Sequence, residues 1–583
     1  MIGAAIALAV STTPAAAQDG WPWSMFEQPK ATPKRGPRKT KRQPDRTRKR
    51  QVPASAAKDS GPRSKLDSKH AAWPILRTEW TARDEAGYEE FIRRIGESGC
   101  RTVHKCLSSP VSNPIYAVSN PPGSVFFADC ADLPYVLRAY YAWKNGLPFS
   151  YSVAVSPLGP SRDIRYTARG NRVVSRRDIV GGAADARRVL REIADAISSA
   201  HYRYPPHPEG RLLPDHYPVG ITPASIRPGT IIYDPNGHLA VVYKVTPEGR
   251  IHFIDSHPDN SLTRSVYGKA FTRASPAMGA GFKRWRPLKL VGAVKVADGT
   301  LKGGRVALAA DKDIPDWSDE QFYGTEKNPR KAWRSARFMI SGQALGFHEF
   351  VRKRLAKAGF KYDPLDEART MMRTLCSDLK YRVDAVDLAI QAKIHLRPQP
   401  ERLPNNIYGT EGDWEIYSTP SRDARLKTAF KELRDEVARF LALSTKDSRS
   451  LTYSGSDLRA DLRQVYETEA KACTITYTRS DGSKKELSFA DVHRHLFDLS
   501  FDPHHCVERR WGARDPTELA TCKDGPLKSQ WYAAEQRLRN QPDRTYDARM
   551  GFSLNELQKK AAGSGIDAPP DIDVMKLLQD PKS

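Results

Sequence analysis

The sequence predicts an α+β protein: a mixed helix-and-strand part, then a mainly helical region, then a small α+β part at the C-terminal end. Three observations support this fold class. Residues 128–296 combine one strong helical pattern, a weaker one over 183–200 and a set of alternating apolar strands. Beyond the Gly-, Lys- and Ala-rich residues 300–312 the apolar spacing becomes helical. From about residue 450 the chain carries a hairpin pattern that turns at Asp481-Gly482.

Helical spacing and capping residues predict where the individual helices lie. The first helix is expected to begin after Thr81 as N-cap and to end at Gly99. Residues 330–357 and 365–391 are predicted as further helices. The clearest pattern covers residues 422–443, where apolar side chains recur at steps of three and four and form one continuous stripe. Such a stripe indicates a helix that packs into a core.

The length and the changes in composition predict several segments. A chain of 583 residues has room for about three or four domains at roughly 150 residues each. The predicted segments are a signal peptide (1–17), a disordered basic Pro-rich tether (18–75), an α+β domain (76–300), a helical domain (313–448) and a disulfide-stapled α+β domain (449–583). After the first residues, no apolar run approaches the roughly 20 residues of a membrane helix, so a polytopic membrane protein is excluded and the mature chain is expected to have no transmembrane span.

The first residues resemble a secretory signal in their composition. Residues 2–10 are an apolar run, Pro14 breaks it, and the small residues Ala15 and Ala17 fit a cleavage site before Gln18. The alternative is a disordered Ala-rich leader. If the segment is a signal, the mature chain is periplasmic or secreted, and cysteine pairing is the default in such an oxidising space.

The charge of the chain is concentrated in the predicted tether. The chain carries 93 Lys and Arg against 68 Asp and Glu, a formal net charge of +25. Residues 30–50, from Lys30 to Arg50, hold eleven basic residues and the single acid Asp45. In an exported protein this run meets anionic cell-wall polymer, lipopolysaccharide or phospholipid first, so we expect an anionic envelope polymer as its partner and disfavour nucleic acid. The alternative is a solvated linker that binds nothing.

Cys130 is the first candidate for chemistry. Leu133 and the residues after it form a helical face that ends at Gly146, and Pro134 is tolerated only in the first turn of a helix. Cys130 therefore lies at or just before a helix N-terminus, where backbone N–H groups lower a thiol pKa and can hold an oxyanion. Asp129 and Asp132 act in the opposite direction, so the thiol needs a histidine partner.

His238 and Asp255 are the candidates for that partner and for the group that orients it. His238 follows a glycine and opens an apolar strand, and Asp255 ends the apolar run of the next strand. Strand side chains alternate, so Asp255, His257 and Asp259 share one face, which pairing about the turn brings beside His238. Asp255 is the preferred orienting carboxylate, with His257 and Asp259 as alternatives. A thiol, a histidine and a carboxylate form a nucleophile, base and orienter set.

Together these segments resemble a known superfamily. The D-C-A-D sequence at the helix start, the R-P-G-T-I-I-Y run before G-H-L-A-V-V-Y and the downstream F-I-D are similar to the papain-like thiol hydrolases of the bacterial envelope, of the NlpC, CHAP and transglutaminase-like types. The resemblance covers residues 76–300. It implies a helix carrying the cysteine packed on an antiparallel sheet carrying the histidine and aspartate, with Cys130 as nucleophile, His238 as base and Asp255 as orienter.

The cysteines and histidines raise two further questions: which cysteine stays free, and whether the chain binds a metal or a nucleotide. If Cys100 pairs with Cys106, and Cys376, Cys473, Cys506 and Cys522 form two more bridges, Cys130 is the one left free, although six cysteines allow fifteen connectivities. A metal site is disfavoured for the cluster His493, His495, His504, His505 and Cys506, because oxidation better explains the cysteine. The chain has no Walker-type Gly loop and no dinucleotide fingerprint. We therefore expect no cofactor and no metal.

These observations lead to one preferred function and one alternative. We expect an exported cysteine hydrolase that cleaves peptide or amide bonds of the cell envelope, with peptidoglycan peptides as the substrate implied by the resemblance. The alternative is a non-catalytic protein that binds the envelope or an anionic polymer through a degenerate papain-like domain.

Overall fold

The computed structural model describes residues 71–161, 163–181, 184–326, 332–357, 359–407, 412–417, 420–542 and 548–580. The predicted signal peptide (1–17) and most of the predicted tether, including the run from Lys30 to Arg50, lie outside these residues. Within the described end of the predicted tether, Trp73 and Ile75 are fully buried in a hydrophobic core. The folded part therefore includes residues that the sequence assigned to the tether.

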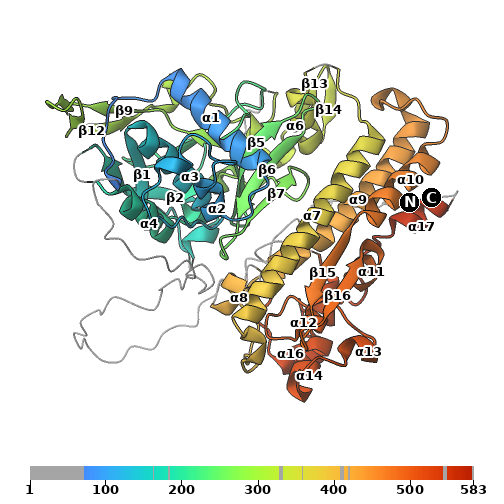
Figure 1. Cartoon of the computed structure of the whole chain (residues 1–583). Helices are drawn as coiled ribbons and strands as arrows, with labels where there is room; N and C mark the ends of the chain where they lie inside the picture. Colours follow the sequence, from blue (N-terminus) through green and yellow to red (C-terminus); the bar gives the residue numbers. More distant parts are fainter. Residues whose placement is uncertain are drawn as a thin grey trace, which may run out of the picture. The chain divides into compact units, whose positions relative to one another are not determined.

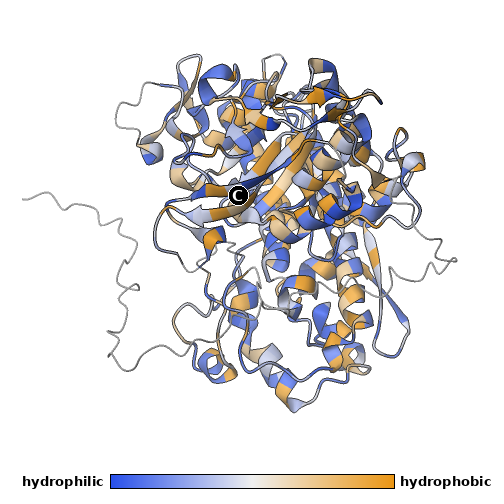
Figure 2. Cartoon of the chain, turned by 90° about the vertical axis from the view of Figure 1, so that its left-hand side faces the viewer, coloured by the Kyte–Doolittle hydropathy of each residue, from blue (hydrophilic) through white to orange (hydrophobic). Residues whose placement is uncertain are grey.

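An antiparallel sheet of six strands forms the centre of the first part of the chain, in the order β3-β8-β4-β5-β6-β7. Its strands are β3 (His216–Pro218), β4 (Ile231–Asp234), β5 (His238–Val245), β6 (Ile251–Ser256), β7 (Leu262–Val266) and β8 (Gly281–Trp285). The neighbours β4, β5, β6 and β7 follow one another along the chain, because short turns suffice to join antiparallel strands. Figure 1 shows β5, β6 and β7 side by side, and in Figure 2 the strands at the centre carry long hydrophobic stretches.

Both faces of this sheet are buried. Side chains alternate along a strand, so Leu239 and Val241 point to one face and Ala240 and Val242 to the other. The first face shares a core with α1 (Ala82–Glu97) and α3 (Leu133–Asn145). The second face shares a core with residues 314–355, which supply buried aromatic side chains such as Phe350. The sequence-predicted boundary at residue 313 therefore falls at the edge of a segment that packs on the sheet.

The two helices on the first face begin and end where their sequences predict. Thr81 is the N-cap of α1 and forms a capping box with Asp84, which satisfies backbone N–H groups that a helix start leaves open. Pro134 occupies the first turn of α3. Gly146 ends α3 in the left-handed region with φ of 62°, a conformation in which a Cβ would be strained. The predicted placement of Cys130 just before this helix is confirmed.

The remaining elements of the first part surround the sheet. The strands β1 and β2 form a two-stranded ribbon, and β9 pairs with β12 and β10 with β11. The bounds are α2 (Val103–Ser108), β1 (Phe149–Pro157), β2 (Asn171–Ile179), α4 (Ala186–Ala196), β9 (Leu288–Val291), β10 (Val294–Lys295), β11 (Leu301–Lys302), β12 (Arg305–Leu308) and α5 (Glu320–Tyr323).

The single helix predicted over residues 330–357 is wrong. A hairpin of β13 (Phe338–Ile340) and β14 (Gln343–Leu345) occupies its middle, and among the described residues 332–357 only α6 (Phe347–Leu355) is an α-helix. The turn of the hairpin has positive φ at both Ser341 and Gly342, which a helix does not accommodate. The buried Phe338 packs in the same core as Phe350, so tertiary packing favours the hairpin.

The rest of the chain is mainly helical with one hairpin, as predicted. The long helices α7 and α9 lie side by side in Figure 1, and the hairpin β15–β16 turns at the predicted Asp481-Gly482. The elements are α7 (Pro364–Gln391), α8 (Asp413–Tyr417), α9 (Pro420–Lys446), α10 (Leu458–Lys471), β15 (Thr474–Thr478), β16 (Lys484–Ser488), α11 (Phe489–His495), α12 (Val507–Arg510), α13 (Pro516–Leu519), α14 (Pro526–Ala534), α15 (Gln536–Asn540), α16 (Leu554–Gln558) and α17 (Val574–Gln579). One hydrophobic core joins α7 and α9 to α10, the hairpin, α11 and α17, and so crosses the sequence-predicted boundary at 448.

All seven cysteines lie within the described residues. The structure pairs Cys100 with Cys106, Cys376 with Cys473, and Cys506 with Cys522, and leaves Cys130 as the free cysteine. This is the partition that the sequence suggested, and it resolves which bridges join the last four cysteines. The bridge from α7 to the start of β15 ties the helical region to the hairpin.

Among the helices that the structure describes, none combines the length and the apolar character that crossing a membrane would require.

Candidate active site

Cys130 lies in the turn that leads into α3, with its side chain against the start of β5. Its Sγ donates to the carbonyl oxygen of Gly237 at 3.9 Å. The backbone of Leu239, one residue beyond His238, also interacts with the thiol. The only free thiol of the chain is therefore held against the two residues that flank the predicted base.

Three side chains fix the turn that carries this thiol. The hydroxyl of Ser256, at the end of β6, donates to the carbonyl oxygen of Ala128 at 2.7 Å, and the amide oxygen of Asn260 accepts from the N–H of Ala128 at 3.3 Å. The phenol of Tyr202 donates to the carbonyl oxygen of Ala131 at 2.6 Å. Because the first two side chains follow Asp255 along the chain, the cysteine turn and the strand that carries the aspartate are tied together.

The two aspartates beside the thiol close the turn on itself. The Oδ1 atom of Asp129 accepts from the backbone N–H groups of Ala131 at 2.9 Å and Asp132 at 3.2 Å, and Oδ2 of Asp132 accepts from the N–H of Asp129 at 3.2 Å. The backbone N–H groups of Ala131 and Asp132, which the sequence offered to an oxyanion, are therefore occupied by a carboxylate in this structure.

The thiol of Cys130 is held in its neutral form. Burial raises its pKa well above the usual range, and the charges of Asp129 and Asp132 raise it further. The decrease in the thiol pKa that the helix start was expected to cause is therefore outweighed. Burial is the largest cause of the raised pKa, and the two aspartates add to it in the direction that the sequence predicted.

His238 and Asp255 form the hydrogen bond that the sequence predicted. Nε2 of His238 lies 2.7 Å from Oδ2 of Asp255, and both residues are buried. Gly237 precedes the histidine with φ of 93°, and a Cβ there would come within 3.0 Å of the hydroxyl of Tyr166. Glycine is thus required at the turn that delivers His238 to the strand end.

Asp255 is an ionised carboxylate in a fully buried position. Burial alone would raise its pKa, but the hydrogen bond from His238 and the charges of His257 and Arg425 hold the pKa well below its usual range. Thr263, its partner across β6 and β7, donates to its other oxygen, Oδ1. Asp255 can therefore orient an imidazole and stabilise its charged form.

The two alternatives for the orienting group lie beside this pair. The ring of His257 stacks on that of His238 with centroids 6.2 Å apart, and its Nε2 lies 3.1 Å from the hydroxyl of Thr263. Burial lowers the pKa of His257. Asp259 instead pairs with Arg422 at 3.4 Å. Of the three candidates, Asp255 makes the hydrogen bond to His238.

The thiol and the imidazole approach the sheet from different sides. Helix α3 packs on the face that bears Leu239 and Ile254, whereas alternation places His238 and Asp255 on the face that bears Ala240 and Phe253. Both lie at the same end of the sheet, because His238 is the first residue of β5 and the thiol of Cys130 contacts the carbonyl oxygen of the residue before it.

A residue that the sequence did not suggest completes the group. Arg425 of α9 donates from Nη1 to Oδ2 of Asp255 at 2.8 Å, and its Nη2 lies 3.3 Å from Nε2 of His238. Asp378 of α7 lies beside Arg425. Burial raises the pKa of Asp378 to about 7; the charge of Arg425 opposes this rise and the charge of Asp255 adds to it. The helical region therefore takes part in the site.

One sequence feature could have pointed to this contact. Arg422 and Arg425 are three apart on one helix face, and they meet Asp259 and Asp255, which also share one side of their segment. No local rule, however, pairs a helix with a strand some 170 residues away.

A cavity of about 390 Å³ lies beside the His238 and Asp378 side chains. It runs between β6 and β7 on one side and α6, α7 and α9 on the other, and its lining mixes the charged groups of Arg425 and Glu432 with aromatic rings such as Phe253. Its volume is that of a small-ligand or peptide side-chain pocket. Cys130 is not part of its lining, so the cavity reaches the histidine side of the site.

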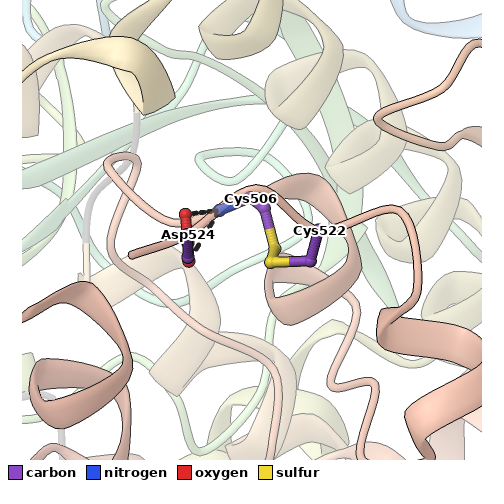
Figure 3. Close-up of side chains that lie close together, drawn as sticks. All are labelled: Cys506, Cys522 and Asp524. Atoms are coloured by element: carbon purple, nitrogen blue, oxygen red, sulfur yellow. Dashed lines mark hydrogen bonds between the residues drawn. A yellow bond between two sulfur atoms is a disulfide. The ribbon is translucent and has the colours of Figure 1, made fainter. Parts of the chain in front are cut away.

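The cysteine in the competing metal cluster is explained by a disulfide. Figure 3 shows Cys506 bonded to Cys522, while Asp524 accepts from the backbone N–H of Cys506 at 3.1 and 3.2 Å. A disulfide sulfur has no thiolate to offer a metal. The five-residue cluster suggested by the sequence therefore loses its cysteine, and the Asp524 carboxylate is already used by the backbone N–H of Cys506.

Comparison of the chain with protein-family models, with curated proteins and with solved structures finds no match.

Proposed function

We propose that this chain is a cysteine hydrolase that cleaves a peptide or amide bond, with Cys130 as nucleophile, His238 as base and Asp255 as orienter. One observation carries the proposal: the free thiol lies against the residue that precedes His238, and Nε2 of His238 lies 2.7 Å from a buried, ionised Asp255. A thiol, an imidazole and a carboxylate in this order are the parts of a nucleophile–base–orienter set.

The chemistry assigns a role to each atom. Asp255 holds Nε2 of His238, so Nδ1 is the nitrogen that would take the thiol proton as Sγ attacks the carbonyl carbon. The imidazolium then returns this proton to the leaving amine as the C–N bond breaks, which leaves a thioester on Cys130. Water, deprotonated by the same imidazole, hydrolyses the thioester and restores the thiol. Because the ground-state thiol is neutral, general-base help from His238 is essential to this scheme.

The oxyanion needs a donor that the resting turn does not present. The N–H groups of Ala131 and Asp132 point to the carboxylate of Asp129. On substrate binding, displacement of that carboxylate by the carbonyl oxygen would free both donors. In this scheme the carboxylate of Asp129 occupies, before substrate binds, the position that the oxyanion takes during the reaction.

The substrate class and location rest on the resemblance. We propose a papain-like fold for residues 76–300, export to the periplasm or beyond, and peptides of the cell envelope, with peptidoglycan peptides first, as substrates. The three disulfides are compatible with an oxidising compartment. The basic run from Lys30 to Arg50 would hold the enzyme near anionic envelope polymer.

A second candidate function has an observation of its own. The guanidinium of Arg425 lies on the His238–Asp255 pair, and the thiol pKa is raised rather than lowered. Both features suit a non-catalytic module that binds envelope peptides through the 390 Å³ cavity. Such a protein would retain binding when the thiol is removed.

The test compares variants of the full chain on soluble peptidoglycan peptides and on casein, with release of new amino groups as the readout. C130A and H238N are expected to abolish release, because they remove the nucleophile and the base. H252N is the matched control. His252 lies on the same strand β6 as Asp255 and pairs with Lys244, but its side chain is on the opposite face of the sheet from those of His238 and Asp255. This control is expected to keep wild-type turnover.

A sedimentation assay on intact sacculi separates the two candidates. The hydrolase predicts that C130A still binds sacculi and leaves them uncleaved, whereas wild type releases soluble fragments. Equal binding by wild type and C130A with no release by either would refute catalysis and favour the binding module.

A further inference from the structure

A second group of buried ligating side chains lies in the C-terminal part, away from the proposed catalytic residues. Asp502 and His505 come from the segment before α12, and Glu535 joins α14 to α15. One nitrogen or oxygen from each residue lies within 4.8 Å of the others. All three residues have an exposed fraction of 0%.

Several of these atoms have no hydrogen-bond partner among the described residues. They are Nε2 of His505 and both carboxylate oxygens of Glu535. A buried carboxyl group without hydrogen bonds costs several kcal/mol of solvation, so native proteins rarely leave one in that state. Two independent side chains therefore present unsatisfied donor or acceptor atoms to the same point.

The other polar atoms of the group are held from outside. Nδ1 of His505 lies 2.7 Å from the hydroxyl of Ser500, which fixes the ring and leaves Nε2 as the nitrogen without a hydrogen-bond partner among the described residues. Oδ1 of Asp502 accepts from the backbone N–H of His504 at 2.8 Å and lies 2.9 Å from its Nδ1. Outer partners of this kind orient the ligands in metal sites.

We infer that Asp502, His505 and Glu535 bind a divalent transition-metal ion of the Zn²⁺ type. One imidazole nitrogen and two carboxylates are donors that Zn²⁺ accepts, and such ions take N and O ligands about 2.0 to 2.2 Å away. The amide of Gln399 donates to Asp502 at 2.5 Å, and its buried Oε1 has no hydrogen-bond partner among the described residues, so this oxygen is available as a further ligand. Full burial makes the site a structural one.

A cation of the chain also lies beside the group. Nη1 of Arg539 lies 3.6 Å from Oε2 of Glu535.

The experiment loads the full chain, stripped with a chelator and dialysed, with ZnCl₂ or CoCl₂. We expect uptake of about one ion per chain, a ligand-field absorption of Co²⁺ typical of four-coordinate N and O ligands, and a rise in Tm that depends on metal concentration. E535Q and H505N are expected to lose the ion and the rise in Tm.

The matched control is E508Q. Glu508 is equally buried, with an exposed fraction of 0%, but its oxygens accept from Ser480 and Thr521 and it is not part of the group. This variant should be destabilised while it still binds about one ion. If E535Q fails to fold, the measurements on the wild-type chain are sufficient. Absence of stoichiometric metal uptake and of Co²⁺ absorption bands between pH 6 and 9 would overturn the inference. Uptake that persists in both E535Q and H505N would also overturn it.

Discussion

The protonation state of Cys130 can be changed by removing one neighbouring charge. The substitution D129N keeps an amide oxygen that can accept from the N–H groups of Ala131 and Asp132, as Oδ1 of Asp129 now does at 2.9 and 3.2 Å. The turn is therefore expected to stay in place while the negative charge beside the thiol disappears. Since that charge raises the pKa of Cys130, the substitution should lower it.

The size of the effect follows from Coulomb's law. If the charge of the adjacent residue is taken as about 6 Å from the thiol, then at an effective dielectric constant of about 20 it contributes about 2.8 kcal/mol, or about 2 pKa units. Solvent near this partly buried cysteine reduces the effect, so a fall of about 1 to 2 units is expected. Below the pKa the thiolate population rises tenfold for each unit, but intrinsic nucleophilicity falls with a Brønsted coefficient of about 0.45. The net gain in rate is about 4-fold for one unit and about 12-fold for two.

The assay is thiol–disulfide exchange with an aromatic disulfide reagent, followed by absorbance between pH 7 and 9. Only one thiol can react, because the other six cysteines are in disulfides. For wild type, the rate should rise tenfold per pH unit with no plateau up to pH 9. For D129N, the rate at pH 7.5 should be about 4- to 12-fold higher.

Two results would refute this reasoning. One is a wild-type rate that levels off near neutral pH, which would mean that the helix start does lower the thiol pKa. The other is a D129N rate equal to that of the control D457N. Asp457 caps α10 by accepting from Ala460 at 3.0 Å, so this control removes the same charge from a helix cap in another part of the chain.

Two further predictions concern stability. D423N leaves the nearly fully buried guanidinium of Arg382, now bound at 3.0 and 2.9 Å, without its carboxylate, so we expect a loss of about 3 to 5 kcal/mol in urea denaturation. E467Q breaks the solvent-exposed pair of Arg463 and Glu467, whose side chains are 50% and 43% exposed, and should cost less than about 1 kcal/mol; equal losses for the two variants would contradict the argument. Burial would raise the pKa of Asp215, but Arg176 and the hydrogen bonds lower it to about 2 from 3.8, so about 2.5 kcal/mol of stability is present above pH 4 and lost as the pH falls towards 2. The difference in unfolding free energy between wild type and D215N should shrink over this range, and a constant difference would contradict the assignment.

Several features were predictable because their causes are local. Proline in the first turn and glycine at the end set the bounds of α3, so the position of Cys130 followed from neighbouring residues. Alternation along β6 correctly placed Asp255 and His257 on one face, and the turn between β5 and β6 brought that face beside His238. The helix predicted over 330–357 failed because packing of Phe338 on the sheet outweighed the local helical pattern.

Sequence alone thus determined the α+β class and the helix start behind Cys130. It suggested Asp255 as the partner of His238 and Cys130 as the free cysteine, but it left alternatives to both that the tertiary structure resolved. Tertiary structure alone decided that Arg425 reaches this pair, that both faces of the sheet are covered, and that Asp502, His505 and Glu535 converge. The physical reason is the sequence distance over which each interaction acts. Capping and alternation act within a few residues, whereas the partners of a buried charge are set by helix packing between segments that no local rule relates.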